Sequence, residues 1–328
     1  MNLFKKKKYL DCHFMKHSLH FFHDSIKACC TNASGPIFYP DYTGESVDWN
    51  YVFKIRKDYV SKINSFFNNE EIPDVCKGCY EINAGVKETK VKKFNNVIDR
   101  LYFHNNMSCN AKCIYCTYQH RERGYKYKVL PLLESLIENK ILSENTTVYM
   151  SGGEITIYPE FEEMMSLLLN YLNSRIEILT SGIKYCKSIQ EAFIQNKCFL
   201  IISIDSGTRE TYKKIKQVDC FDIVVENLKK YIQASDNVKD NVVLKYIIVD
   251  GYNDNKEEIK YFIELVSSLG IKNVRLDVDY EKYKLADDVK VPDYYFDLIS
   301  YFNALALQNN LIVNHFEQVD AILEKSKS

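Results

Sequence analysis

The chain has 328 residues, enough for one large domain or a large domain with a smaller companion, because about 150 residues per domain is only a soft guide. Its 43 Lys and Arg against 44 Asp and Glu give a formal net charge of -1, which excludes an overall field that would attract nucleic acid or anionic membranes. No apolar run approaches a membrane span of about 18 residues or the core of a signal peptide. The sequence therefore predicts a soluble, cytoplasmic protein whose partners include neither nucleic acid nor a membrane.

The cysteines of the chain are grouped rather than scattered. Disulfides are rare in the predicted compartment, so closely spaced cysteines indicate metal binding or redox chemistry. The eleven cysteines comprise an N-terminal group, a central motif and three isolated positions. These are, in that order, Cys12, Cys29, Cys30, Cys76 and Cys79; Cys109, Cys113 and Cys116; and Cys186, Cys198 and Cys220.

Residues 1–92 are predicted to form a small, Cys-rich N-terminal module. The segment contains turn signals at "NASGP" and "PDYTGES", one helix near 49–68 and otherwise short, irregular stretches. Histidines at 13, 17, 20 and 23 accompany the cysteines, and we expect them to be exposed or stacked on aromatic rings rather than bound to metal. Because such a segment buries little apolar surface, a bound metal would help it to fold.

Residues 93–328 alternate between short apolar runs and longer amphipathic segments. Runs rich in Val and Ile that are separated by helices are typical of parallel strands with right-handed crossovers. The predicted strands are 97–103, 146–150, 175–180, 199–205, 242–249 and 273–279, with a weaker one at 310–316. The predicted helices are 129–142, 160–173, 188–196, 221–233, 255–270 and 293–309. This order predicts an α/β fold, a partial (β/α)6 barrel with a C-terminal helix.

The central cysteine motif "CNAKCIYC" occupies the loop directly after the first of these strands. In parallel α/β sheets, ligands bind at the carboxyl ends of the strands. Three thiolates can hold three irons of a 4Fe–4S cubane and leave the fourth iron open. With Tyr115 before the third cysteine, the motif resembles the cluster motif of the radical S-adenosylmethionine (SAM) superfamily. The resemblance implies that Cys109, Cys113 and Cys116 bind the cluster.

The next predicted strand is followed by "SGGE", which resembles the superfamily's GGE motif. The resemblance implies that Gly152, Gly153 and Glu154 hold the amino group of the SAM methionine. Two glycines let the backbone approach a ligand closely, and a carboxylate is a charge-assisted partner for an ammonium group.

Later strand ends carry further candidates for cofactor contact. The third strand ends in "LTSGI" and the fourth in "ISIDSGTRETYKKI", and both are similar to the superfamily's strand ends. The resemblance implies contacts to the cofactor from Tyr115, Ser181, Ser203 and Asp205, and from Lys245 to the SAM carboxylate or ribose. Ser and Asp at such positions often only cap the following helix.

The resemblance covers roughly residues 95–285 and implies a reaction. A reduced 4Fe–4S cluster would donate one electron to SAM, and the resulting 5'-deoxyadenosyl radical would abstract a hydrogen atom from the substrate. The protein would position the radical and exclude water from it. The electron would come from a flavodoxin- or ferredoxin-type donor.

The N-terminal cysteines resemble part of the SPASM or Twitch pattern, which binds an auxiliary 4Fe–4S cluster, although that module usually follows the barrel. The resemblance implies ligation by Cys12, Cys76 and Cys79 and by Cys30, with Cys29 as its alternative. A structural zinc bound by the same thiolates, or by three of them with His13, is the competing interpretation.

No residue decides the reaction subclass. We expect a small-molecule substrate, possibly a carbohydrate, that undergoes oxidation, dehydration or epimerisation, with maturation of a ribosomally made peptide as the alternative. An alternative from another class is a non-catalytic iron–sulfur or zinc-binding protein. Cys220 is the candidate hydrogen-atom donor, whereas Cys186 and Cys198 resemble small core residues.

Overall fold

The structure, a computed structural model, describes residues 17–29, 37–68, 96–116, 124–279, 292–315, 319–320 and 322–323. The chain divides into two compact units. The first comprises Met1–Asn106, Gly124–Gly152 and Asn170–Ser174, and the second comprises Met107–Arg123, Gly153–Leu169 and Arg175–Ser328. The domain boundary predicted at 92 and 93 lies outside the described residues, as do Cys12, Cys30, Cys76 and Cys79.

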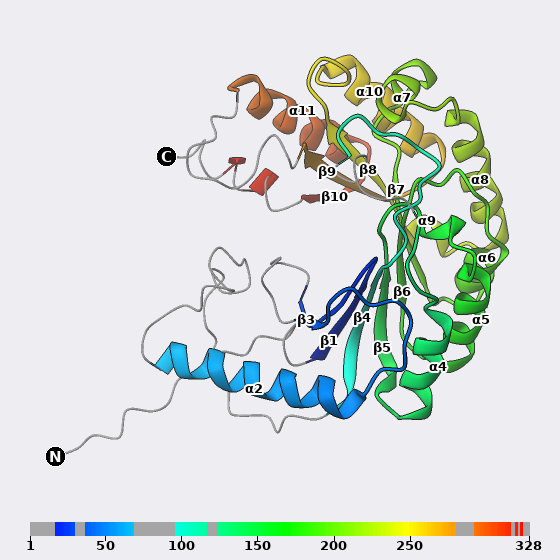
Figure 1. The fold of residues 1–328 in the computed structure, drawn as a ribbon. Coiled ribbons are helices and arrows are strands. Elements are labelled where there is room, and N and C mark those ends of the chain that lie inside the picture. Colours follow the sequence, from blue (N-terminus) through cyan, green and yellow to red (C-terminus); the bar gives the residue numbers. More distant parts are fainter. Residues whose placement is uncertain are drawn as a thin grey trace. The chain divides into compact units, whose positions relative to one another are not determined.

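The described residues of the first unit form five strands in the order β5-β4-β1-β2-β3. These are β1 (Ser18–Phe22), β2 (Ile26–Lys27), β3 (Ile37–Tyr39), β4 (Ile98–His104) and β5 (Leu142–Met150), accompanied by the helices α2 (Trp49–Asn68) and α4 (Leu130–Glu138). Strand β4 pairs parallel with both β1 and β5, whereas β1, β2 and β3 are joined by antiparallel pairing. The N-terminal segment therefore adds strands to the sheet that contains β4 (Figure 1).

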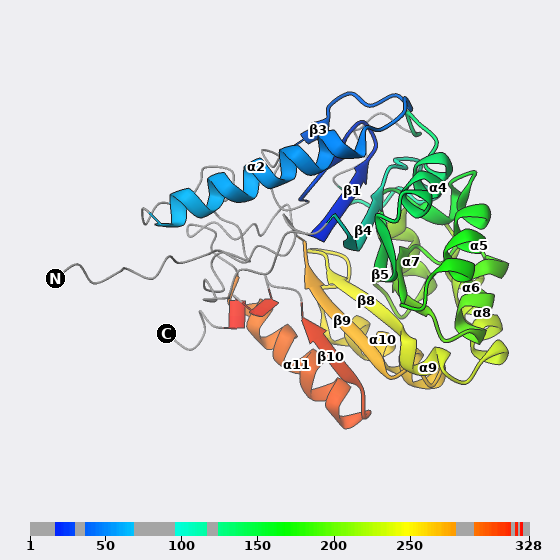
Figure 2. The ribbon, with the colours of Figure 1, turned by 90° about the horizontal axis from the view of Figure 1, so that it is seen from below.

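The second unit contains five strands in the order β10-β9-β8-β7-β6, and each neighbouring pair is parallel. The strands are β6 (Ile176–Thr180), β7 (Cys198–Ser203), β8 (Val242–Ile248), β9 (Asn273–Val278) and β10 (Ile312–His315). The helices are η2 (Ile155–Ile157), α5 (Phe161–Tyr171), α6 (Lys187–Ile194), α7 (Arg209–Lys216), α8 (Phe221–Ala234), α9 (Val238–Asn241), α10 (Lys256–Ser268) and α11 (Tyr294–Gln308). Figure 2 shows β8, β9 and β10 side by side, with α11 next to β10.

The predicted α/β class, with mostly parallel strands and intervening helices, is confirmed. Strand β8 shows why its sequence was informative, because six of its seven residues are buried, as expected for a strand covered on both faces. The predicted helix 129–142 is wrong at its end, since α4 stops at Glu138 and β5 begins at Leu142. Lys140 between them has a φ of 55°, a left-handed conformation that cannot continue a helix.

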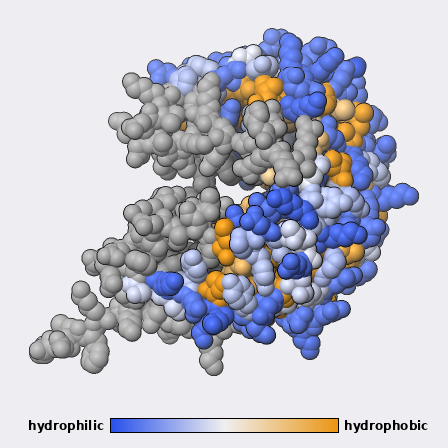
Figure 3. Space-filling model, viewed as in Figure 1, coloured by the Kyte–Doolittle hydropathy of each residue, from blue (hydrophilic) through white to orange (hydrophobic). Residues whose placement is uncertain are grey.

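The helices that border the site begin and end at recognisable signals. Thr208 caps α7 by accepting a hydrogen bond from the Thr211 amide, and Gln217, with a φ of 55°, ends that helix. Asn255 caps α10 in the same way by accepting from the Glu258 amide. On the face shown in Figure 3, the outer helices are mainly hydrophilic, as expected for amphipathic helices. No helix in the described ranges is long and apolar enough to cross a membrane.

Candidate cofactor site

The three central cysteines lie in one loop of the second unit, directly after β4. All three are half-buried thiols. The Ala111 amide donates a hydrogen bond to the Cys109 sulfur at 3.5 Å, and the Cys116 amide donates to the Cys113 carbonyl at 3.0 Å. Burial raises the pKa of Cys109 to about 11, and the charges of Glu154, Cys113 and Cys116 add to that shift. The thiols therefore lie close enough to influence one another.

Among the described residues, no three His, Cys, Asp or Glu side chains converge on one ion. A cubane makes a different demand, because each of its thiolates binds a separate iron. Three half-buried thiols in one loop therefore fit the ligand set of such a cluster.

The turn after β5 is packed tightly against the backbone around it. A Cβ at Gly153 would lie 2.4 Å from the Ser108 carbonyl oxygen, and the Glu154 amide donates to that same oxygen at 2.8 Å. At Gly152, where φ is +119°, a Cβ would lie 2.7 Å from the Asn106 carbonyl oxygen. Both glycines are needed because no side chain fits at these close approaches.

The Glu154 carboxylate is buried, with 1% exposure, and lies among hydrogen-bond donors. One of its oxygens accepts from the Thr156 amide at 3.1 Å, from the Thr156 hydroxyl at 2.7 Å and from the Thr180 hydroxyl at 2.7 Å. The other accepts from the Ser181 amide at 2.6 Å. Glu154 thus connects the turn before η2 to the carboxyl end of β6.

Ser181 also contacts the cysteine loop directly. Its hydroxyl donates to the Asn110 side-chain oxygen at 3.1 Å, and Asn110 follows the first cysteine of the motif. The residues predicted from "SGGE" and "LTSGI" therefore meet the cluster loop within the second unit. Whether they contact SAM remains a prediction.

Asp205 is fully buried, with 0% exposure, at the carboxyl end of β7. One carboxylate oxygen accepts from Tyr115 Oη at 2.5 Å and from Lys216 Nζ, and the other accepts from the Ile247 amide at 2.9 Å. Lys216 Nζ also donates to Tyr115 Oη at 2.7 Å. Two predicted cofactor residues, Tyr115 and Asp205, therefore meet in a buried network that includes a lysine.

The backbone at Asp205 is held in an uncommon conformation. Its φ is 57°, in the left-handed region that non-glycine residues seldom adopt. The buried Asn253 side chain donates to the carbonyls of Asp205 and Ile247, each at 2.8 Å. Such strain is found where surrounding contacts fix it, often at functional sites.

Ser203 and Lys245 lie opposite each other on neighbouring strands. Lys245 Nζ forms an ion pair with Asp277 at 3.2 Å, and Asp277 also accepts from Arg275 Nε at 3.1 Å. No side-chain hydrogen bond of Ser203 is found among the described residues, so its hydroxyl is available to a ligand. The predicted contact of Lys245 with SAM stays a prediction.

Tyr212 supplies an observation that points to a bound group. Its side chain is fully buried on α7, and within the described part of the chain its hydroxyl has no hydrogen-bond partner. Burial raises its pKa, and the charges of Cys220, Cys113, Asp205 and Glu154 raise it further. An orphaned buried hydroxyl costs about 1 to 3 kcal/mol unless a ligand satisfies it. Because the charge of Cys113 influences Tyr212, this hydroxyl lies near the cysteine loop, and a polar cofactor bound there would satisfy it.

The other cysteines of the second unit differ in their surroundings. Cys220 is half-buried at the N-cap of α8, close enough for its charge to influence Tyr212. Cys186 and Cys198 are buried core residues, and burial raises the pKa of both thiols. The role of Cys220 as a hydrogen donor remains a prediction.

Two histidines of the first unit are packed among aromatic rings. His20 stacks on Tyr102 at 4.1 Å between ring centroids, and His104 stacks on Phe22 at 5.1 Å. Burial lowers the pKa of His104 to about 4, and it also lowers that of His20, with smaller effects from His104, Arg56 and Lys27. His20 therefore behaves as expected of a stacked histidine.

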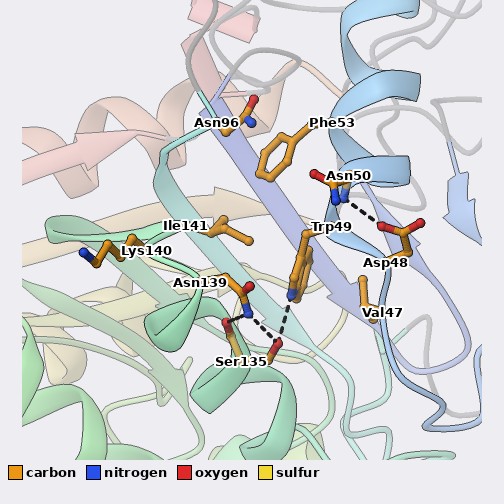
Figure 4. A pocket seen from close by; sticks show the side chains of 10 residues that line it. All are labelled: Val47, Asp48, Trp49, Asn50, Phe53, Asn96, Ser135, Asn139, Lys140 and Ile141. Atoms are coloured by element: carbon orange, nitrogen blue, oxygen red, sulfur yellow. Dashed lines mark hydrogen bonds between the residues drawn. The ribbon is translucent and has the colours of Figure 1, made fainter.

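The first unit contains a pocket of about 330 Å³ (Figure 4). Trp49 Nε1 donates to Ser135 Oγ at 2.9 Å at its wall, and Asn96 and Ile141 line it just before β4 and β5 begin. It therefore lies at the amino ends of these strands, opposite the end at which parallel sheets bind ligands.

Sequence reasoning did not identify several residues of the site, namely Asn110, Thr156, Thr180, Tyr212, Lys216 and Asn253. Lys216 ends the basic stretch "KKIK" and resembles a solvated lysine. The available signal was helical spacing, because Tyr212 and Lys216 are four residues apart and share one face of α7 with Ile215 between them.

Comparison with known proteins agrees with this geometry. Residues 107–266 match the sequence model described as the Radical SAM superfamily. A protein of Saccharolobus islandicus named "Probable GTP 3',8-cyclase" is 26% identical over 219 residues, which cover 64% of this chain and 68% of that protein.

Solved structures share the fold. Streptococcus suis SuiB bound to S-adenosylmethionine superimposes with a TM-score of 0.52 at 16% identity, covering 83% of this chain and 66% of SuiB. SuiB bound to its precursor peptide SuiA gives a TM-score of 0.52 at 13% identity, covering 85% of this chain and 69% of SuiB. The superfamily uses a 4Fe–4S cluster and SAM. Residues 107–266 of the chain therefore form a radical SAM domain.

Proposed function

We propose that this enzyme reductively cleaves SAM and abstracts a hydrogen atom from a small-molecule substrate. The observation that supports this most strongly is the connection of the cysteine loop to the GGE turn through Ser108, Asn110, Glu154 and Ser181. When bound, the cluster and SAM supply an electron and a 5'-deoxyadenosyl radical, which becomes 5'-deoxyadenosine as the substrate loses hydrogen.

The chain's own residues bind and orient these groups. Cys109, Cys113 and Cys116 would hold the cluster, and the turn at Gly152 and Gly153, which is packed against the backbone of residues 106–108, would contact the methionine part of SAM. Glu154 would orient its ammonium group. The Ser203 hydroxyl, Lys245 and Asp205 are the further candidates for cofactor contact, together with the aromatic Tyr115.

A small-molecule substrate is supported by the curated relatives, which are named for a reaction of GTP. Peptide maturation is the alternative, because SuiB is known in complex with a precursor peptide. A carbohydrate substrate has no support beyond our sequence interpretation. Electron delivery by a flavodoxin- or ferredoxin-type protein is part of the proposal, and Cys220 is the proposed hydrogen donor if the reaction is an epimerisation.

We also propose an auxiliary 4Fe–4S cluster on Cys12, Cys30, Cys76 and Cys79, with Cys29 as the alternative to Cys30. The support is their spacing in the sequence. Iron and sulfide analysis with Mössbauer spectroscopy tests it. About eight irons per chain that fall to about four in the triple alanine variant of Cys109, Cys113 and Cys116 would support two clusters. Four irons that fall to none would contradict the auxiliary cluster.

The reaction is tested by anaerobic reconstitution with iron and sulfide, reduction with dithionite, and measurement of 5'-deoxyadenosine formed from SAM. The triple variant should lose this activity completely, while Cys198→Ala, at a buried position outside the loop, should keep it. GTP and a synthetic peptide are then compared as additives. Faster SAM cleavage with GTP supports the small-molecule proposal, and faster cleavage with the peptide alone contradicts it. Undiminished activity in the triple variant would contradict the assignment of the cluster ligands.

A further inference from the structure

Helix α7 contacts the cysteine loop through its last turn. The amides of Lys112 and Ile114 donate to the carbonyls of Lys216 and Ile215, each at 3.0 Å. The two donors flank Cys113 in the sequence. Ile114 and Tyr115 also pack against a buried apolar cluster that includes Ile215. The backbone of the loop is thus fixed to the C-terminal end of this helix.

The side chain of Lys216 lies within this contact. It is only 2% exposed, and its Nζ bonds to Asp205 and, at 2.7 Å, to the hydroxyl of Tyr115, which precedes Cys116. Burial lowers the pKa of Lys216, but Asp205 and Cys113 outweigh that effect, so the net pKa is raised and the ammonium group keeps its charge. A positively charged side chain is therefore buried between Asp205 and Tyr115 of the cysteine loop.

Lys216 is distinct from the other lysines of α7. Lys213 and Lys214 are exposed, and Lys213 reaches Asp219 at 3.6 Å. Buried lysines are rare because desolvation of the charge is expensive unless it is paired. A buried neutral side chain could fill the same space, so the charge itself calls for an explanation beyond packing.

We propose that Lys216 is a positioning residue that sets the reduction potential of the SAM-binding cluster through its charge. The proposal rests on the assignment of the cluster to Cys109, Cys113 and Cys116. One-electron reduction makes the cluster more negative, and a nearby cation stabilises the reduced form. Lys216 therefore raises the potential and makes reduction easier, while Asp205, the paired carboxylate, opposes it.

The direction of the effect separates this role from a merely structural one. Loss of a cation lowers the potential. Loosening of the loop would instead expose the cluster to water, which stabilises the more highly charged reduced form and raises the potential. A variant that removes the charge and one that only disturbs packing should therefore move the potential in opposite directions.

The test is an EPR-monitored redox titration of reconstituted protein without SAM. In Lys216→Met we expect the equilibrium constant for reduction of the cluster at a fixed potential to be at least tenfold smaller. For a one-electron couple, a tenfold change lowers the reduction potential by about 59 mV. Lys216→Arg keeps the charge and should restore most of the wild-type value. Lys214→Met, an exposed position on the same helix, is the matched control and should leave the potential unchanged.

Asp205→Asn and the double variant Asp205→Asn with Lys216→Met complete the design. The single carboxylate variant should shift the potential upward, and the double variant should return it toward the wild-type value. The double variant also avoids a buried unpaired charge, so it remains informative if Lys216→Met alone does not fold.

An unchanged or raised potential in Lys216→Met would overturn the proposal. If Lys216→Met does not fold, the proposal would be overturned by a double variant whose potential stays at or above that of Asp205→Asn. Iron content and the EPR signal of the wild type are read first. Absence of a cluster there would refute the cluster assignment itself, whereas a cluster whose potential ignores Lys216 would refute only the tuning role.

Discussion

Gly153 lies too close to the cysteine loop to carry a side chain. A Cβ there would lie 2.4 Å from the Ser108 carbonyl oxygen and 2.8 Å from Met107 backbone atoms. Because backbone must move to relieve this overlap, we expect Gly153→Ala to destabilise the apo protein by about 1 to 3 kcal/mol and to reduce iron uptake. Urea unfolding and iron analysis measure the two effects.

Gly251→Ala is the matched control for this substitution. Its φ is 77°, a positive value that Gly153 does not share, and a Cβ there would meet nothing within 4 Å. It should therefore show backbone strain alone and retain normal iron uptake. Equal iron loss in both variants would mean that the close approach to Ser108 does not account for the loss.

Glu154 gives a second prediction for a single residue. The four hydrogen bonds described above for its carboxylate all come from donors, so the amide nitrogen of Glu154→Gln, itself a donor, would face another donor. We expect a loss of about 1 to 3 kcal/mol in the free energy of unfolding and weaker SAM binding by calorimetry. Glu163→Gln, an exposed change on α5, should alter neither. Wild-type SAM affinity in Glu154→Gln would remove Glu154 from the cofactor site.

At the scale of elements, the β7–α7 turn is fastened to the first turn of α10. The Glu258 carboxylate accepts hydrogen bonds from the hydroxyls of Ser206 at 3.2 Å, Thr208 at 3.2 Å and Thr211 at 2.7 Å. Next to it, a Cβ at Gly207 would lie 2.1 Å from the Tyr261 backbone. These contacts set the start of the helix whose end holds the cysteine loop.

We therefore expect Glu258→Gln to destabilise the protein by about 1.5 to 3 kcal/mol, because a charged acceptor shared by three hydroxyls is replaced by a neutral group with one acceptor. Urea unfolding measures the loss. Glu264→Gln on the same helix, whose ion pair with Lys260 is exposed, should change stability by less than about 0.5 kcal/mol. Similar losses in both variants would show that the contact to the β7–α7 turn adds nothing.

At the scale of the whole molecule, the buried histidines predict how stability depends on pH. Burial lowers the pKa of His104 from 6.5 to about 4, and that of His20 is lowered as well. Between pH 6.5 and pH 4 the unfolded chain binds a proton at His104 that the folded chain does not. The contribution of His104 to the free energy of unfolding is therefore fully present above pH 6.5 and decreases as the pH falls toward 4. Each histidine contributes a slope of at most about 1.4 kcal/mol per pH unit.

Urea unfolding of the apo protein at several pH values measures this dependence. In His104→Phe, which keeps a ring against Phe22, the slope between pH 4 and 6.5 should be smaller, while the dependence above pH 7 should stay as in the wild type. An unchanged slope in the acid range would show that His104 does not carry the effect.

Much of this architecture could be predicted from sequence, for reasons that differ between parts. Strands such as β7 and β8 are buried runs of Val, Ile and Leu, and their apolar character is strong over six or seven residues. In contrast, β2 has two residues and β3 has three, so they exist only through pairing with neighbours and leave no periodic signal. The predicted strands 97–103 and 146–150 correspond to β4 and β5.

The candidate site divides in the same way. Its motifs were visible because cysteine spacing and paired glycines have few other uses. The partners of those motifs were not, because the pairing of Lys216 with Asp205 joins a helix end to a strand end and depends on tertiary structure. From the sequence, Asp205 was a candidate for cofactor contact or for capping the next helix, whereas in the structure three donors from other parts of the second unit bond to its carboxylate.

The attachment of the cysteine loop to α7 has a consequence for maturation of the enzyme. Because two loop amides are already bonded to α7 carbonyls, Cys113 is presented on a backbone that needs little ordering when iron and sulfide arrive. A preassembled cluster delivered by a carrier protein would thus bind to a loop whose backbone around Cys113 is already ordered. We expect such delivery to change amide hydrogen exchange little at Lys112 and Ile114, in contrast to metal sites that fold only around their metal.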